Sequence, residues 1–160
     1  LSDHDAELIK AGKPYIGYTY GALDSAKELL GLDIDYVVPD YGYDALTTVE
    51  YVDQDSMTTA TYRGEGDNLV YFYDGSYITK LPKGAVELMR ITKDDFVEGW
   101  MDPAHQAEYK GSTQAFDYAQ DGMDMTIFAN TLTNKTHQQD DYRFLTGALY
   151  SKLLGDDFKA

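Results

Sequence analysis

Histidine and glutamate side chains give the first candidate for chemistry in this sequence. His105 and Glu108 are three residues apart, a spacing that would place both on one face of a helix. Imidazole and carboxylate can bind zinc together, but a zinc site needs three or four ligands. His4 and His137 lie far away along the chain, and no histidine falls in a known metal-binding spacing. We therefore predict no metal site from the histidines.

Carboxylates are the most abundant reactive groups, with 28 Asp and Glu residues against 13 Lys and Arg. Calcium takes six to eight oxygen ligands, which loop aspartates can supply, yet no segment follows the spacing of an EF-hand. Two carboxylates could also hydrolyse a glycoside, but the sequence singles out no pair for that reaction. Most aspartates suit helix caps and turns. Calcium binding stays open, and a hydrolase is the least favoured function.

Several kinds of catalytic site are missing from the sequence. The chain has no cysteine, which excludes disulfides, thiolate zinc sites and cysteine nucleophiles. It has no G-x-S-x-G pattern, no P-loop and no G-x-G-x-x-G pattern. We predict no catalytic residue and no cofactor. The sequence does not decide whether the chain is an enzyme, and it favours a role that is not enzymatic.

Tyrosine offers a binding surface in place of a catalytic site. Fifteen tyrosines are present, and this side chain combines an apolar ring with a polar tip that suits half-buried sheet positions and protein interfaces. Those on expected strands are most simply sheet residues. Those in or beside expected loops are candidates for ligand contact, together with the single tryptophan: Tyr15, Tyr18, Tyr20, Tyr36, Tyr41, Tyr43 and Trp100.

The charge of the chain limits its partners. A formal net charge of −15 argues against nucleic acid and against an anionic membrane surface, because both require clustered Lys and Arg. Arg63, Arg90 and Arg143 are scattered along the chain. No run of 18 apolar residues is present, so we predict no transmembrane segment.

Patterns of capping, hydrophobic spacing and turn residues predict the secondary structure. Ser2 and Asp5 form a capping box, and Asp102 precedes a proline that suits the first turn of a helix. Asp74-Gly75 is a strong signal for a β-hairpin. Residues 15–20 suit either a strand or an aromatic loop, and residues 85–91 suit either a strand or a helix. Helices are expected at residues 2–12, 21–31, 92–99, 102–111, 112–122 and 139–154, and strands at 34–38, 46–53, 57–63, 69–73, 76–81 and 123–132.

This order of elements predicts an α+β fold. A run of strands separated from runs of helices is typical of a mostly antiparallel sheet, here of four to six strands packed against N- and C-terminal helices. Residues 46–53 and 57–63, and residues 69–73 and 76–81, are expected to form hairpins. We divide the chain into residues 1–13, a short helix or mobile leader, and residues 14–160, a single α+β domain.

One resemblance points to a location. The stretch Thr47–Asp53, followed by Met57–Tyr62, resembles small secreted or lipoprotein-type domains of lactic acid bacteria, as do the opening Leu1-Ser2-Asp3 and the segment Lys93–Phe96. The resemblance covers about a third of the chain. It implies an extracellular or cell-surface domain of a Gram-positive bacterium, seen after removal of a signal peptide. Membrane anchoring would then go through a lipid outside this chain.

The resulting hypothesis is an extracytoplasmic, non-catalytic binding domain with an aromatic and acidic surface. Its ligand is an unknown glycan, peptide or protein. The alternative is an acidic inhibitor or immunity-like protein that masks a basic site on a partner.

Overall fold

A computed structural model of the chain describes residues 1–39, 45–73, 75–133 and 141–154. The helices are α1 (Asp3–Lys10), α2 (Tyr20–Glu28), the 3-10 helix η1 (Ala60–Tyr62), α3 (Pro103–Tyr109) and α4 (Asp141–Leu154). The strands are β1 (Tyr15–Tyr18), β2 (Asp35–Val37), β3 (Ala45–Tyr51), β4 (Asn68–Phe72), β5 (Tyr77–Lys80), β6 (Val86–Gly99), β7 (Thr113–Tyr118) and β8 (Met125–Phe128). Among these residues no helix is long and apolar enough to cross a membrane.

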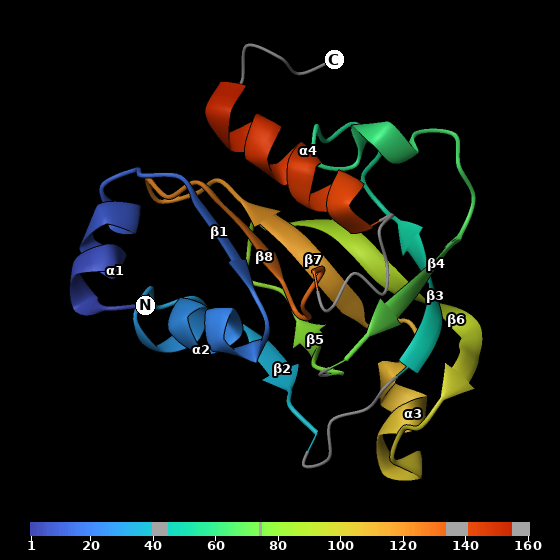
Figure 1. Cartoon of the computed structure of the whole chain (residues 1–160). Coiled ribbons are helices and arrows are strands. Elements are labelled where there is room, and N and C mark those ends of the chain that lie inside the picture. The colour runs from blue at the N-terminus through green and yellow to red at the C-terminus, as the bar shows by residue number, and fades with distance from the viewer. Residues whose placement is uncertain (40–44, 74, 134–140, 155–160) are drawn as a thin grey trace.

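All eight strands belong to one curled sheet (Figure 1). The order β1-β8-β7-β6-β3-β4 forms its main path, and β5 joins β2 to β7. β1 pairs with β8 in parallel, whereas the other described pairings are antiparallel. The predicted α+β class is confirmed, but the sheet is mixed and larger than the four to six strands expected.

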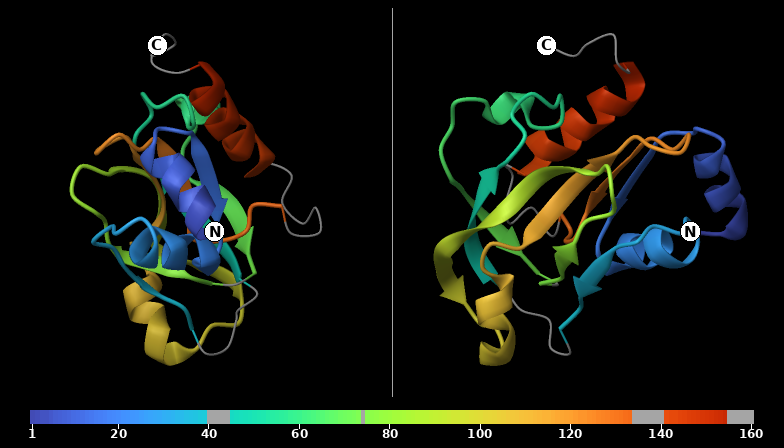
Figure 2. Two further views of the ribbon diagram at one scale, coloured as in Figure 1. Left: turned by 90° about the vertical axis from the view of Figure 1, so that its left-hand side faces the viewer. Right: turned by 180° about the vertical axis from the view of Figure 1, so that it is seen from behind.

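Helices cover both faces of the β1 end of this sheet (Figure 2). On one face, α1 and α2 bury Ile9 and Leu23 in a core shared with Ile127 of β8. On the other face, α4 buries Phe144 against Phe128 of β8, with the two rings 5.0 Å apart. β1 and β8 therefore lie between two layers of helices, as strands of α/β proteins do.

Local capping chemistry explains the helices that were predicted correctly. In α1 the Ser2 hydroxyl accepts from the backbone N–H of Asp5, and the Asp5 carboxylate accepts from the N–H of Ser2. In α3 the Asp102 carboxylate accepts from the N–H of Ala104, and Pro103 occupies the first turn. Both are the arrangements that the sequence pattern indicated. The expected division at residue 13 stays a prediction.

Two predicted helices are wrong, because sheet pairing overrides local propensity. Residues 92–99 belong to β6, where Gly99 and Phe96 pair with Ala45 and Thr47 of β3. Residues 112–122 contain β7, which pairs with β6 and with β8 along its length. β7 gains hydrogen bonds on both of its edges, and the end of β6 gains them along β3. These bonds exceed the few tenths of a kcal/mol that separate helix propensities.

Both predicted hairpins are also wrong. Residues 57–63 form turns and η1, where the Thr59 hydroxyl donates to the carbonyl of Asp53 and so holds a compact loop. Gly75 has a positive φ of 64°, as a turn requires, yet the flanking strands separate. β4 pairs with β3, and β5 pairs with β2 and β7. The Asp74-Gly75 signal predicted a turn between β4 and β5, but these two strands do not pair with each other.

The loop at residues 57–63, where a strand was expected, packs directly on α4. A Cβ added to Gly147 would lie 2.4 Å from the carbonyl oxygen of Thr58, which is closer than real atoms approach. Tyr62, at the end of η1, stacks on Tyr51 with ring centroids 3.9 Å apart and contacts Phe144. Helix α4 is therefore held against this loop by close packing at Gly147 and by the aromatic cluster of Tyr51, Tyr62 and Phe144.

We expect Gly147→Ala to destabilise the protein, because the new methyl group must push α4 away from the Thr58 carbonyl. Overpacking of this kind costs about 1–3 kcal/mol. Chemical denaturation with urea measures the loss. Thr146→Ala is the matched control, since Thr146 is exposed and its hydroxyl donates within α4 to the carbonyl of Tyr142. Equal stability of the Gly147→Ala variant and the wild type would contradict this account of α4 packing.

Candidate functional site

The chain changes abruptly from strand to helix at one strained residue. β1 ends at Tyr18 and α2 begins at Tyr20, and Thr19 between them has φ 68° and ψ 172°. A positive φ is unusual for any residue with a side chain, and for a β-branched residue it is an outlier. Such outliers cluster at functional sites. A strained residue on a sharp strand-to-helix turn is the geometry of a nucleophile elbow.

A glycine stands two residues to either side of Thr19, and the first of them is required by close packing. A Cβ on Gly17 would lie 2.7 Å from the Cβ of Ala22, so β1 and α2 approach each other only because residue 17 has no side chain. On the other side of the turn, a Cβ on Gly21 would lie 3.7 Å from the Thr19 hydroxyl oxygen. The segment Gly17-Tyr18-Thr19-Tyr20-Gly21 is thus G-x-S-x-G with threonine in the serine position. The sequence pattern misses Thr19 because it requires serine.

The N-terminus of α2 gives this position an electrostatic function. The Thr19 side chain makes no capping hydrogen bond to the helix. The first N–H groups of a helix lack intrahelical partners and carry the positive end of its dipole. In a nucleophile elbow the N–H of the residue after the nucleophile, here Tyr20, stabilises the oxyanion of a reacting carbonyl. The turn can therefore polarise a carbonyl group placed beside Thr19.

The neighbouring strand places no base beside Thr19. β1 and β8 run in parallel with Tyr18 opposite Phe128, and Thr19 and Ala129 are the next residues after these two strands. Ala129 is fully buried, and its N–H donates to the carbonyl of Gln114 at 2.7 Å. Within the described residues, no histidine or carboxylate hydrogen-bonds to the Thr19 hydroxyl. The elbow thus presents a hydroxyl that has not been activated.

Three of the predicted binding residues meet at this turn. Tyr15 and Tyr18 lie on β1 and Tyr20 begins α2, with Tyr18 and Tyr20 about half exposed. Their place beside Thr19 was not predicted, and their role in ligand contact stays a prediction.

The other predicted binding residues lie elsewhere or outside the described chain. Tyr36 on β2 donates its phenolic hydrogen to Asp24 of α2, and burial together with this bond raises the pKa of Tyr36 to about 12. Trp100 is exposed between β6 and α3. Tyr41 and Tyr43 fall outside the described residues. The five described residues of the predicted set thus lie on β1, α2, β2 and the segment before α3.

His105 and Glu108 share a face of α3, as their spacing predicted, and both contact Tyr77. The Tyr77 hydroxyl donates to the Glu108 carboxylate at 2.8 Å and lies 3.3 Å from Nδ1 of His105. Tyr77 is fully buried, and burial, with the Glu108 bond second, raises the pKa of its phenol. No group of three or more possible metal ligands occurs within the described ranges. These contacts anchor α3 to β5.

A second polar cluster joins α4 to the sheet. Lys152 is almost buried and lies 2.6 Å from Asp124 and 3.8 Å from Asp117 of β7. Asp117 also accepts from the hydroxyls of Ser56 and Thr126. Burial raises the pKa of Asp117, against the opposing effect of Lys152 and the two hydroxyls. The charged groups of this cluster are paired within it, which suits an anchor better than a reaction site.

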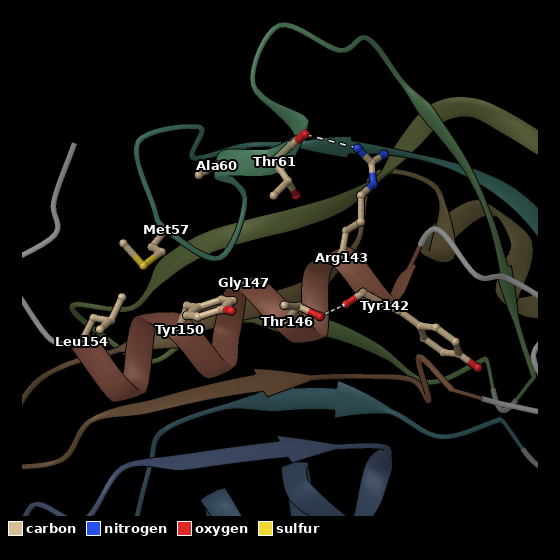
Figure 3. A pocket seen from close by; sticks show the side chains of 9 residues that line it. All are labelled: Met57, Ala60, Thr61, Tyr142, Arg143, Thr146, Gly147, Tyr150 and Leu154. Carbon is tan, nitrogen blue, oxygen red and sulfur yellow. Dashed lines mark hydrogen bonds between the residues drawn. The ribbon is translucent and has the colours of Figure 1, made fainter.

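An apolar pocket lies on the opposite side of α4 from the sheet. It has a volume of about 500 Å³ and lies between α4 and the loop that leads into η1 (Figure 3). Met57, Tyr150 and Leu154 contribute its apolar wall, and Arg143 lies at one end. Arg143 is already paired with Glu65 at 2.9 Å and lies over the ring of Tyr62. The pocket therefore presents little free charge.

The fold is similar to that of glutamine amidotransferases of known structure. The chain is similar to a protein from Thermoplasma acidophilum assigned as one subunit of a GMP synthase, with a TM-score of 0.61 and 12% identity over 94% of this chain and 63% of that chain. It is also similar to a glutamine amidotransferase from Thermotoga maritima, with a TM-score of 0.52 and 16% identity over 96% of this chain and 56% of that chain. The chain thus spans about three fifths of the length of these structures.

Sequence comparison adds no further relative. No protein-family model matches the chain, and no similar curated protein was found. At identities of 12% and 16%, the structural likeness shows the fold and leaves the activity to be argued from the site.

This similarity overturns the resemblance to lipoprotein-type domains of lactic acid bacteria. The resemblance relied on short segments that cover about a third of the chain, whereas the amidotransferase fold covers nearly all of it. The hypothesis of a non-catalytic binding domain, with an inhibitor as its alternative, is wrong for the same reason, and so are the lipoprotein-like and Gram-positive attributes that rested on that resemblance. The extracellular or cell-surface location stays a prediction. The segment Thr47–Asp53 is part of β3 and the loop after it, which are structural elements of the sheet.

The strain at Thr19 predicts that one substitution there will make the protein more stable. We expect Thr19→Gly to raise the free energy of unfolding by about 1 kcal/mol, because glycine adopts this conformation without the steric cost of about 1–3 kcal/mol that threonine bears, offset in part by its greater freedom when unfolded. Urea denaturation measures the difference. Thr19→Val, which keeps the branched side chain, is the control and should give no gain. A Thr19→Gly variant less stable than the wild type would contradict the claim that the Thr19 conformation lowers stability.

The buried carboxylate predicts how stability varies with pH. Because the pKa of Asp117 is higher in the folded than in the unfolded protein, its contribution to stability is present below the unfolded pKa and is lost as pH rises through the folded pKa. Asp117→Asn removes this loss, so the stability of the variant relative to the wild type should increase as pH rises from the unfolded to the folded pKa of Asp117. Denaturation at several pH values tests this, with exposed Asp67→Asn as control. A difference that stays constant with pH would refute it.

Proposed function

We propose that the chain is a domain of the glutamine amidotransferase type in which the hydroxyl of Thr19 stands in place of a catalytic thiol. The observation that carries the proposal is the strained turn at Thr19, set between Gly17 and Gly21 in a fold of that class. The chain has no cysteine, so the thiol on which this class depends is absent. The backbone of the elbow supports an amidotransferase-type site. Thr19, in the position of the nucleophile, changes the chemistry that this site can perform.

The proposed substrate is a carboxamide, with glutamine as the first candidate because the similar proteins are named for it. The carbonyl carbon would lie beside the Thr19 hydroxyl, with its oxygen toward the N–H of Tyr20. The hydroxyl oxygen bonds to that carbon, the hydroxyl proton goes to the departing nitrogen, and ammonia leaves a Thr19 ester. Water then hydrolyses the ester, which releases the acid and restores the hydroxyl.

The reaction at Thr19 should be slow. A hydroxyl is a weak nucleophile until an adjacent base removes its proton, and a thiol is much less dependent on that help. Ala129 follows β8 directly, as Thr19 follows the paired residue Tyr18, so it is the position from which the neighbouring strand could supply a base. When the nucleophile and base of an enzyme are removed, binding and the oxyanion hole still give about 10³–10⁴-fold acceleration over water. The Thr19 hydroxyl adds a slow nucleophilic route to this baseline, so we expect the wild-type domain to be faster than this range and far slower than an enzyme with an activated nucleophile.

Restoring both missing groups should restore fast hydrolysis. We expect Thr19→Cys alone to raise the rate of ammonia release from glutamine, and Thr19→Cys combined with Ala129→His to raise it by about a further 10²–10⁴-fold, because general base catalysis contributes that much. A coupled assay for ammonia measures the rate. Labelling with a thiol-reactive glutamine analogue, followed by mass spectrometry, would locate the adduct on residue 19.

Two controls make this test decisive. Thr146→Cys places a thiol on exposed α4, away from the elbow, and should give neither activity nor a specific adduct. Thr19→Ala should abolish whatever ester the wild type forms. The proposal fails if Thr19→Ala hydrolyses carboxamides as fast as the wild type. It also fails if the folded double variant, checked by circular dichroism, is no faster than the wild type.

A further inference from the structure

One edge of β1 is open. Among the described strands β1 pairs only with β8 and lies at the end of the sheet (Figure 1). The N–H of Tyr15 donates to the carbonyl of Asp124 beside β8, at 3.0 Å. Because backbone groups of a strand alternate in direction, Tyr15 and Gly17 face β8, whereas the N–H and C=O groups of Ile16 and Tyr18 face away from it. These are obligatory hydrogen-bonding groups directed at the open edge.

β1 is otherwise built as an interior strand. Tyr15 packs against the core of α1 and α2, and Ile16 packs against the core that contains α4, so both faces of the strand are covered. Natural edge strands are protected by charged residues, proline or bulges. β1 is Tyr-Ile-Gly-Tyr, without any of these, and its register with β8 is continuous. Helix α1 lies on this side of the molecule (Figure 2), but its buried residues, Ala6 and Ile9, pack into the core shared with α2.

We propose that the open edge of β1 receives a parallel strand from polypeptide outside these 160 residues. Both similar structures extend well beyond the part that this chain matches, by 37% and 44% of their lengths when the covered 63% and 56% are subtracted from the whole. β1 already takes part in parallel pairing with β8, and parallel strands are typically buried within a sheet. A strand on the other side of β1 would satisfy Ile16 and Tyr18 and enclose the elbow at Thr19.

A second copy of this chain is a poorer occupant of the edge. Two copies would bring together two net charges of −15, and the repulsion opposes their association. A two-fold dimer would also pair β1 with itself in the antiparallel sense. A small ligand cannot match hydrogen-bonding groups that repeat along the strand. The inference concerns the sheet and does not depend on any reaction at Thr19.

Hydrogen exchange measured by NMR tests the proposal residue by residue. In the isolated 160-residue chain, we expect the Ile16 and Tyr18 amides to exchange at least about 100-fold faster than those of Tyr15 and Gly17, because only the latter pair are bonded to β8. In the complete gene product that contains these residues, all four amides should be protected. Sedimentation velocity on the same samples reports the oligomeric state.

A proline variant supplies the matched comparison. Proline is tolerated on an edge strand when its missing N–H would face solvent. Tyr18→Pro should therefore leave the isolated chain folded but lower the urea midpoint of the complete gene product, whereas Tyr18→Thr, which keeps the N–H, should not. The proposal is overturned if Ile16 and Tyr18 are protected in the isolated monomer, or stay unprotected in the complete product. Protection that appears only with dimerisation would assign the edge to a second copy of the chain instead. A gene product that consists of only these residues would also overturn the proposal.

Discussion

The contact between β1 and α2 is the constraint on which the candidate site depends. Gly17 lets the strand approach Ala22 of the helix closely, and the chain must then reverse from strand to helix within one residue. That residue is Thr19, and its positive φ is the geometric consequence of the short turn. The proposed site follows from this, because the strained residue 19 is followed directly by the first N–H of α2.

Exchanging a thiol for a hydroxyl on this frame changes the chemistry and leaves the geometry in place. The frame supplies position and oxyanion stabilisation, which are properties of the backbone and do not depend on the side chain. The side chain supplies the nucleophile, and a hydroxyl requires a base where a thiol needs less help. Ala129, the residue directly after β8, has no side chain that could act as a base. The two positions act together, so a change at either one alone recovers only part of the reaction.

The sequence predicted the elements whose causes are local and missed those whose causes are distant. Ser2 with Asp5, and Asp102 with Pro103, begin helices through contacts within a few residues, and both helices were predicted. Residues 113–118 became a strand because β6 and β8 lie on either side, which no local pattern records. At the site, Thr19 could have been found by allowing threonine in the elbow pattern. Its strain and the proximity of Ala129 could not, because they arise from packing and strand register.

The strain at Thr19 is itself an argument that the turn is used. Threonine is among the least favourable residues for a positive φ, and glycine would occupy the same backbone with less steric cost. A turn that served only to join β1 to α2 would gain stability from glycine and lose nothing. A hydroxyl held there at a cost, free of any capping bond, and set beside helix N–H groups is better explained by a role for the side chain at that position.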